Sequence, residues 1–140
     1  MSSIMQLRTD HVELFDICQL LEDSIAGDVP PSSVDLFGVR KKLTAKLIAH
    51  LKSEDWLLYP RLLESGDAQI ASTARAFVEE MGGLASAFNA YVERWDAFRI
   101  EREWSQYKAE TASIIETLRN RIVRENRELY PLIEKLDKAA

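Results

Sequence analysis

Apolar residues recur along most of the chain at intervals of three and four, which is the spacing of an α-helix with one buried face. Four long segments show this pattern: residues 5–25, residues 34–63, a third that begins after Asp67 and runs to about 95, and residues 103–136. No segment shows the strict alternation of apolar and polar residues that is typical of a half-buried strand. The pattern therefore predicts an all-α protein.

Three short breaks separate the four segments. Residues 26–33 are rich in Gly, Pro and Ser and end in a serine suited to capping the next helix. Residues 65–67 end in Asp67, another good capping residue. Residues 96–102 contain neither Gly nor Pro, so this boundary is the least defined. Short connections favour antiparallel neighbours, and the predicted architecture is an up-down-up-down four-helix bundle.

Length and composition narrow the class of protein. The 140 residues fit one domain, residues 1–140, that can bury a core without disulfides. Cys18 is the only cysteine, which excludes an intrachain disulfide and a thiolate metal cluster. The net charge of −5 argues against nucleic-acid or anionic-membrane partners. No apolar run is long enough to span a membrane and no signal peptide is visible, so we expect a cytoplasmic protein.

One pattern occurs twice, in residues 50–60 and in residues 121–131. Each copy places a glutamate five residues before a Tyr-Pro pair. Four residues before that glutamate, the first copy has His50 and the second has Arg121. Residues four apart share one face of a helix, so His50 and Glu54 can bind the same ion, whereas Arg121 cannot act as a ligand in this way. The proline of each copy predicts a kink in its helix.

Five polar residues lie on the stripes that should face the core: His11, His50, Glu54, Arg121 and Glu125. An ionised carboxylate in a core costs several kcal/mol unless it is paired or bound to a metal. Two histidines and two glutamates at one level of a bundle need a common explanation. A divalent cation provides one, because imidazole nitrogen and carboxylate oxygen suit Fe, Mn and Zn.

These features resemble the hemerythrin-like (HHE cation-binding) domain. The resemblance spans nearly the whole chain in the order and length of its helices, and it is strongest at residues 50–60 and 125–131, where a His-x-x-x-Glu motif and Leu-Tyr-Pro stand out. It implies a four-helix bundle with a non-haem di-iron centre that binds or senses oxygen or senses redox state. One iron takes histidines from the first and second helices, the other takes histidines from the third and fourth, and two carboxylates bridge them.

The resemblance implies a role for four residues, here called the four candidate ligands. His11 resembles the first-helix ligand and His50 the second-helix ligand. Glu54 and Glu125 match the two bridging carboxylates. Together these residues would complete the protein ligands of one iron.

The chain departs from the family at the other iron. Arg121 stands where the fourth-helix histidine is expected, and the third helix has no histidine, since the chain contains only two. Met81 lies near the position of that lost ligand. Gly82-Gly83 follows it, and two adjacent glycines weaken a helix. They indicate either a local bend beside the metal pocket or close packing across the bundle.

The departure leaves three states of the site open. In the favoured one, a single ion binds the four candidate ligands, and the fixed charge of Arg121 offsets the carboxylates at the vacated position. In the second, a further ion is held by the glutamates, water and a carboxylate such as Glu79 or Glu80. In the third, no ion binds and Arg121 joins the histidines in a buried polar network. Non-haem iron is the expected ion, with manganese or zinc as alternatives.

The expected function is sensing or regulation, with O2 or NO as candidate signals. Reversible oxygen carriage is disfavoured because it needs two irons, and enzymatic activity is not expected because no further base or nucleophile accompanies the site. The alternative is a metal-free interaction module in signalling or stress response, with a protein partner. Exposed aromatic residues would favour that alternative. Trp56 falls off the buried stripe of the second helix, whereas Trp95 continues the buried stripe of the third. Trp104 either caps the bundle or faces a partner.

Overall fold

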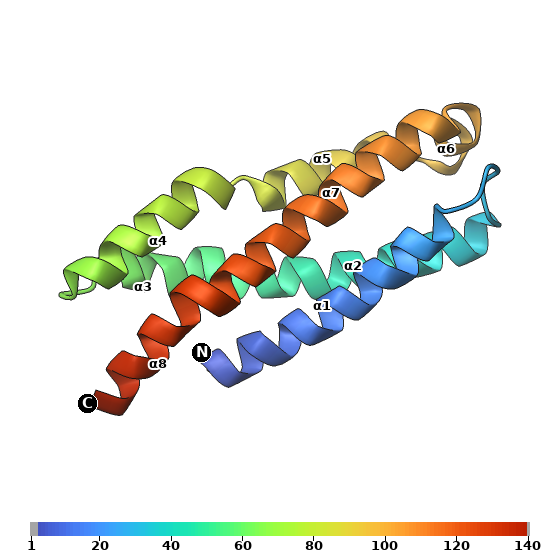
Figure 1. Ribbon diagram of the computed structural model, residues 1–140. Coiled ribbons are helices and arrows are strands. Elements are labelled where there is room, and N and C mark those ends of the chain that lie inside the picture. The colour runs from blue at the N-terminus through green and yellow to red at the C-terminus, as the bar shows by residue number, and fades with distance from the viewer. Residues whose placement is uncertain (1–2, 140) are drawn as a thin grey trace.

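The computed structural model describes residues 3–139, with side chains described through residue 135. Within this part of the chain the secondary structure is helical throughout (Figure 1). The elements are α1 (Ile4–Ser24), α2 (Ser33–Lys52), the π-helical turn η1 (Ser53–Leu58), α3 (Tyr59–Leu63), α4 (Ala68–Met81), α5 (Leu84–Arg94), α6 (Ala97–Arg102), α7 (Trp104–Arg124), the π-helical turn η2 (Glu125–Leu129) and α8 (Tyr130–Ala139).

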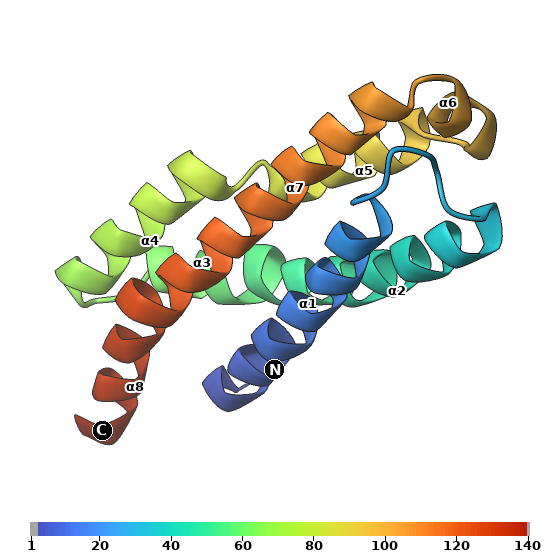
Figure 2. The same ribbon diagram turned by 45° about the vertical axis from the view of Figure 1, so that its right-hand side comes forward.

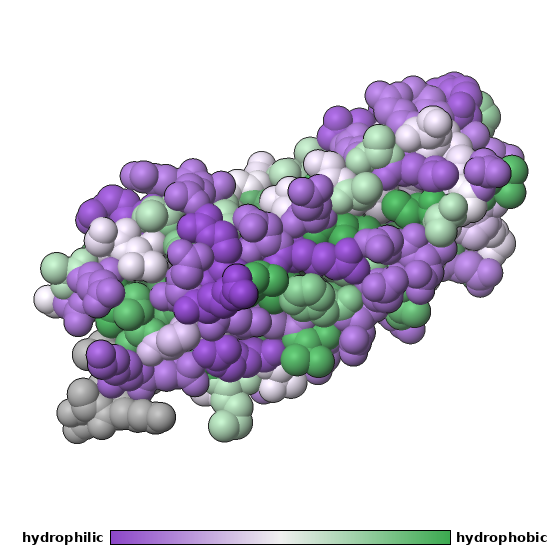
Figure 3. Space-filling view, viewed as in Figure 1, coloured by the Kyte–Doolittle hydropathy of each residue, from purple (hydrophilic) through white to green (hydrophobic). Residues whose placement is uncertain are grey.

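The elements form four antiparallel rods, which confirms the predicted all-α bundle. The rods are α1, then α2–η1–α3, then α4–α5, then α7–η2–α8 (Figures 1 and 2). Both ends of the chain lie toward one end of the bundle, and α6 lies at the other. Polar residues cover most of the face seen in Figure 3, with apolar residues in small patches. None of the described helices is long and apolar enough to cross a membrane.

Side-chain caps define where several helices begin. Asp67 accepts backbone N–H groups at the start of α4, which confirms this predicted cap. At the start of α2 the cap is Ser32, which accepts the Asp35 N–H, one residue before the predicted Ser33. The predicted third break is incomplete, because it contains the short helix α6. Asp96 starts this helix by accepting the Arg99 N–H, an N-cap signal that can be read in the sequence.

The two Tyr-Pro motifs lie at wide π turns. Tyr59 N–H bonds to the carbonyl of Glu54, five residues earlier, and Tyr130 N–H bonds to Glu125 in the same way. Proline lacks an N–H and crowds the carbonyl four residues before it, so a wider turn ahead of it relieves the conflict. The extra residue also rotates the helix. Leu57 lies three residues after Glu54 and would share its buried face in an uninterrupted α-helix, but it is 50% exposed and Leu58 is buried instead.

The third rod breaks at Gly82-Gly83, between α4 and α5. A Cβ atom on Gly82 would approach the Val78 carbonyl oxygen to 2.5 Å, and a Cβ on Gly83 would meet no atom within 4 Å. The contacts of Gly82 are thus with its own rod. Of the two explanations offered by the sequence, these contacts favour the local bend.

The core consists of two apolar clusters. One lies toward α6 and contains buried residues of α1, α2, α5 and α7, such as Leu14, Leu47 and Phe88. The other lies toward the chain ends and includes Leu58 and Leu129. The five polar residues predicted to face the core fall between these clusters along their helices. We call this group, with the polar side chains that contact it, the polar layer.

Candidate metal centre

The polar layer brings all five predicted residues together. His11, His50, Glu54, Arg121 and Glu125 are each at most 3% exposed. Arg121 therefore points inward, although it lies in the last turn of α7, ahead of a predicted kink. Four rods contribute to this level of the bundle, because the carbonyl of Met81, the last residue of α4, also contacts Arg121.

Four potential ligand atoms converge in the layer. One atom from each of the four candidate ligands lies within 4.8 Å of all the others. His11 Nε2 is 3.1 Å from Glu125 Oε1, and His50 Nε2 is 3.0 Å from Glu54 Oε1. Ligand atoms on opposite sides of one metal ion are about 4 Å apart, given metal–ligand bonds of about 2.0–2.2 Å. A small inward movement of the side chains would complete such a site.

The histidine tautomers favour a cation between these atoms. His11 Nδ1 lies 2.7 Å from the amide oxygen of Asn126, which can only accept, so Nδ1 carries the proton and Nε2 offers a lone pair when the ring is neutral. His50 Nδ1 likewise donates to Asp10 Oδ2 at 3.0 Å. Such outer contacts orient metal-binding imidazoles. In each Nε2–carboxylate pair two acceptors then face each other, an arrangement that needs a proton or a cation between them.

Within the polar layer, one buried side-chain atom has no hydrogen-bond partner among the described residues. His50 Nε2 forms no hydrogen bond to any described residue, although Glu54 Oε1 is 3.0 Å away, because the geometry is not that of a hydrogen bond. Buried polar atoms are nearly always satisfied, so such an exception points to a missing partner. An imidazole nitrogen of this kind is a preferred ligand for a transition metal. The residues present therefore fit a metal cation.

The two π turns exchange hydrogen bonds through their tyrosines. Tyr59 of the first copy donates to Glu125 Oε2 of the second at 2.6 Å, and Tyr130 of the second donates to Glu54 Oε2 of the first at 2.6 Å. The Tyr130 hydroxyl also lies 3.2 Å from His11 Nε2. In each i→i+5 turn the tyrosine N–H bonds to the carbonyl of its own glutamate, so the tyrosine lies one turn beyond that glutamate. From there its hydroxyl reaches the glutamate of the opposite turn.

Arg121 lies among the carboxylates of the polar layer. Its Nε donates to Glu125 Oε2 at 3.3 Å, and its Nη2 donates to Glu54 Oε1 at 3.2 Å and to Asp55 Oδ1 at 2.8 Å. Its Nη1 donates to the Met81 carbonyl at 3.2 Å. The Met81 side chain packs in the apolar cluster, so this residue contributes only its backbone. Arg121 thus binds both candidate bridging carboxylates.

The electrostatics of the layer follow from burial and these contacts. Burial and the neighbouring carboxylate of Glu54 raise the pKa of Glu125. Burial would also raise the pKa of Glu54, but His50 and Arg121 lower it below its usual value. Burial opposes protonation of His50, yet Glu54 and Asp10 raise its pKa to about 9. Burial raises the pKa of Tyr59 strongly, so its hydroxyl stays a neutral donor.

Several residues of the layer were not identified from the sequence. Asp10 holds His50 and is itself paired with Lys46 at 2.8 Å, while Asn126 holds His11 and Asp55 holds Arg121. Tyr59 and Tyr130 were seen only as part of the repeated pattern. Their shared spacing of five residues from a glutamate was the available signal. Asp10, Asp55 and Asn126 are sequence neighbours of site residues, which alone does not distinguish them from surface residues.

The structure offers no support for a second ion held by Glu79 or Glu80. Both residues are exposed on the outer face of α4, and Glu80 pairs with Arg124. The space beside Arg121 is instead a cavity of about 210 Å³. Its walls are formed by Asp55, Tyr59, Phe77, Val78, Gly82 and Arg121.

Comparison with known proteins agrees with this geometry. A model of the hemerythrin HHE cation binding domain matches residues 2–133, a range that includes both π turns and all four candidate ligands. Searches of curated proteins and of solved structures found no match. Because the family model covers nearly the whole sequence, the chain belongs to the hemerythrin HHE cation-binding domain family.

Proposed function

We propose that this domain binds one divalent transition-metal ion and serves as a sensing or regulatory protein. The ion is held by His11 Nε2, His50 Nε2, Glu54 Oε1 and Glu125 Oε1. The observation that carries the proposal is the unpartnered Nε2 of His50, which faces a carboxylate oxygen at 3.0 Å in a fully buried layer. Mixed imidazole and carboxylate ligands suit iron, with manganese or zinc as alternatives. Bound iron would supply a Lewis-acidic, redox-active centre.

The charge of the polar layer supports one ion in preference to two. With neutral histidines, the layer contains four carboxylates and one guanidinium, namely Asp10, Glu54, Asp55, Glu125 and Arg121, and Lys46 at its edge pairs with both Asp10 and Glu13. One divalent ion offsets most of this negative charge. A second would leave an excess of positive charge in a buried region, which is costly.

The outer oxygens of the two glutamates support the same stoichiometry. Glu125 Oε2 accepts from Tyr59 and Arg121, and Glu54 Oε2 accepts from Tyr130. A carboxylate that bridges two metals through both of its oxygens would have to give up these hydrogen bonds. Glu54 Oε1 also accepts from Arg121 Nη2 at 3.2 Å, so the arginine stays beside the one oxygen that Glu54 offers to the ion.

The proposed sensing role rests on access and on the lack of spare catalytic groups. The candidate ligands are nearly inaccessible to solvent, while the cavity of about 210 Å³ beside Arg121 has room for a small molecule such as O2 or NO. The imidazoles and carboxylates that face the ion are themselves ligands or their hydrogen-bond partners. This arrangement favours binding over turnover, and we propose a non-enzymatic protein of the cytoplasm.

One observation supports the alternative function, a metal-free interaction module. Trp56 is 70% exposed on η1, next to the half-exposed Leu57, and exposed tryptophan is typical of binding surfaces. Trp95 is buried, as its place on the stripe predicts. Trp104 is half-buried and donates to the carbonyl of Gly27, so it caps the connection after α1.

Metal analysis of protein purified without chelator or affinity metal tests the proposal. We expect close to one iron, manganese or zinc per chain, before or after anaerobic reconstitution with Fe(II). Glu54→Ala and His50→Ala should each abolish binding. Glu128→Gln is the matched control, since Glu128 is an exposed glutamate of η2 that pairs with Arg124. Two ions per chain, or metal retained in both ligand variants, would contradict the site. No metal after reconstitution would favour the interaction module.

A further inference from the structure

A second buried arginine lies far from the polar layer. Arg40, in the first half of α2, is 4% exposed. Its Nη1 donates to the Trp95 carbonyl at 2.7 Å and its Nη2 donates to the Val92 carbonyl at 3.2 Å. Both carbonyls belong to the C-terminal end of α5. Arg40 therefore ties α2 to α5, but it takes no part in the metal centre.

Arg40 forms no ion pair with any described residue. Its contacts with described residues are the two carbonyls and the rings of Phe37, Tyr91 and Tyr107, whose centroids lie 4.7, 5.3 and 5.9 Å from Cζ. The Nε–H group is buried and has no acceptor among these residues. The carbonyl end of a helix and aromatic faces attract a cation. They do not replace a carboxylate, and a buried charge is rarely left without one.

An apolar cavity of about 500 Å³ lies beside this arginine, between α2 and the C-terminal end of α5. Its volume is typical of pockets that hold small organic molecules. Besides Arg40, the walls are formed by Phe37, Lys41, Thr44, Ala45, Val92, Trp95 and Asp96. Lys41 adds a second positive charge, and the carboxylate of Asp96 is engaged in capping α6.

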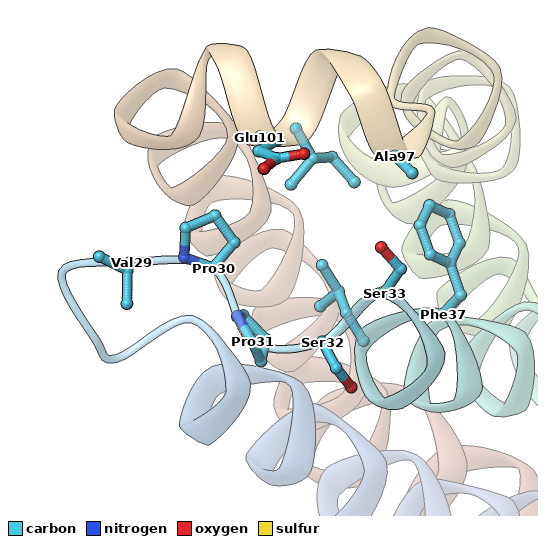
Figure 4. A pocket seen from close by; sticks show the side chains of 10 residues that line it. Val29, Pro30, Pro31, Ser32, Ser33, Phe37, Ala97 and Glu101 are labelled. Atoms are coloured by element: carbon cyan, nitrogen blue, oxygen red, sulfur yellow. The ribbon is translucent and has the colours of Figure 1, made fainter.

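Phe37 separates this cavity from another one of similar size. The second cavity lies between residues 29–33 and α6, and Figure 4 shows the Phe37 ring reaching from α2 toward Ala97 at its edge. Its lining residues include no buried charge, and its acidic group, Glu101, is exposed. The cavity beside Arg40 is therefore the one that combines apolar walls with an unbalanced buried cation.

We propose that the cavity beside Arg40 binds a small organic carboxylate with an apolar body. The carboxylate pairs with the guanidinium of Arg40, and the apolar body lies against Phe37, Val92 and Trp95. Arg40 suits this role because a guanidinium has five N–H groups, of which two have acceptors in the described structure. The site is independent of the metal centre, and neither proposal depends on the other.

Octanoate and octanamide test the proposal on the intact protein. The two probes share one apolar chain, but only octanoate carries a charge. Binding is followed by the indole N–H resonances of the three tryptophans, assigned by single Trp→Phe variants. We expect saturable shifts of Trp95, which lines the cavity, and none of Trp56, which is exposed on η1 near the metal centre. Octanamide should bind at least about tenfold more weakly, since a hydrogen bond to a charged group is lost.

Variants locate the charge contact. Arg40→Gln should weaken octanoate binding at least about tenfold and leave the weaker binding of octanamide unchanged. Arg75→Gln, which alters an exposed arginine of α4, should bind octanoate as the wild type does. Arg40→Gln also removes the hydrogen bonds to the end of α5 and could destabilise the protein. The comparison of octanoate with octanamide on the wild-type protein does not depend on this variant. Equal affinity for both probes, or saturation without a shift of Trp95, would overturn the proposal.

Discussion

The two π turns share their backbone and most of their chemistry, yet one is preceded by a histidine and the other by an arginine. Each turn presents a buried glutamate and a buried tyrosine, and each tyrosine binds the glutamate of the opposite turn. One turn earlier, His50 faces its glutamate with an unpartnered nitrogen, whereas Arg121 contacts both glutamates. Under the proposed function, both copies supply a glutamate, and this one position determines whether a copy adds a further ligand or a permanent positive charge.

The residues that orient His50 and Arg121 differ as well. His50 is oriented by Asp10, a carboxylate that stabilises the Nδ1–H tautomer and leaves Nε2 free. Arg121 is oriented by Asp55 and by the Met81 carbonyl, which accept its remaining N–H groups. The bundle therefore satisfies the arginine as a permanent partner of the carboxylates. An asymmetric site follows from a nearly symmetric backbone.

Loss of Arg121 should have the largest effect, a fall in the stability of the metal-free protein. Arg121→Leu leaves three carboxylates without their buried cation, and we expect metal-free protein to lose about 3–5 kcal/mol of unfolding free energy. Urea unfolding of chelator-treated protein measures this. Arg124→Leu is the matched control on the same helix, because Arg124 pairs with exposed glutamates and should change stability by at most about 1 kcal/mol. Equal losses in the two variants would contradict the role given to Arg121.

The histidine of the first copy should make metal-free stability depend on pH. The pKa of His50 is about 9 in the fold, above the usual 6.5, so its proton stabilises the metal-free fold fully below pH 6.5. That contribution, about 3 kcal/mol, is lost as pH rises through 9. Urea unfolding at pH 6.5 and pH 9 should show the loss in the wild type but not in His50→Gln. Bound metal should abolish it, because the ligand is the neutral imidazole.

Exchanging the residue type at position 50 or 121 directly tests the proposed difference between the two copies. His50→Arg makes the first copy like the second, and we expect metal affinity to fall by at least about a hundredfold, since loss of a ligand should cost no less than loss of an outer contact. Arg121→His leaves all four candidate ligands in place and should retain at least one ion. Competition with a chromophoric chelator gives both affinities. Similar affinities for the two variants would mean that the copies do not differ in the way proposed.

The tyrosines should have the smallest effect on metal affinity. Tyr130→Phe and Tyr59→Phe each remove one hydrogen bond from a ligand carboxylate, which should lower affinity about tenfold. Tyr130→Phe should cost more, because it leaves Glu54 Oε2 without a described donor, whereas Glu125 Oε2 keeps Arg121 when Tyr59 is changed. Tyr107→Phe, in the apolar cluster near α6, is the control and should bind metal normally. The reverse order of the two tyrosines would contradict the crossed arrangement.

Much of the fold and the centre of the site can be predicted from the sequence. Helical periodicity defines the four rods, and polar residues on apolar stripes identify the five buried residues of the layer. The i,i+4 spacing of His50 and Glu54 is a local relation that the helix preserves. These predictions depend on one helix at a time, and the bundle then brings the stripes together.

The remaining features depend on contacts between rods or on changes of helix type. The exposure of Leu57 follows from the π turn, which shifts the phase of the helix by one residue. The crossed tyrosine bonds join residues 66 and 76 positions apart, and the pairing of Asp10 with His50 spans 40. Spacing within a helix contains no information about such partners. The sequence offered a bend at Gly82-Gly83 as one of two explanations, and the neighbours of Gly82 favour the bend.

The long separation of the ligands has a kinetic consequence. His11 and Glu125 are 114 residues apart, so they meet only after the first and last rods have docked. In the unfolded chain the His50–Glu54 pair is the one local fragment of the site. An ion that binds only the completed bundle slows its unfolding and leaves the rate of folding unchanged. Because the candidate ligands are buried, an ion bound by them could leave only as fast as the bundle opens, and that motion would set the lifetime of the metal-loaded state.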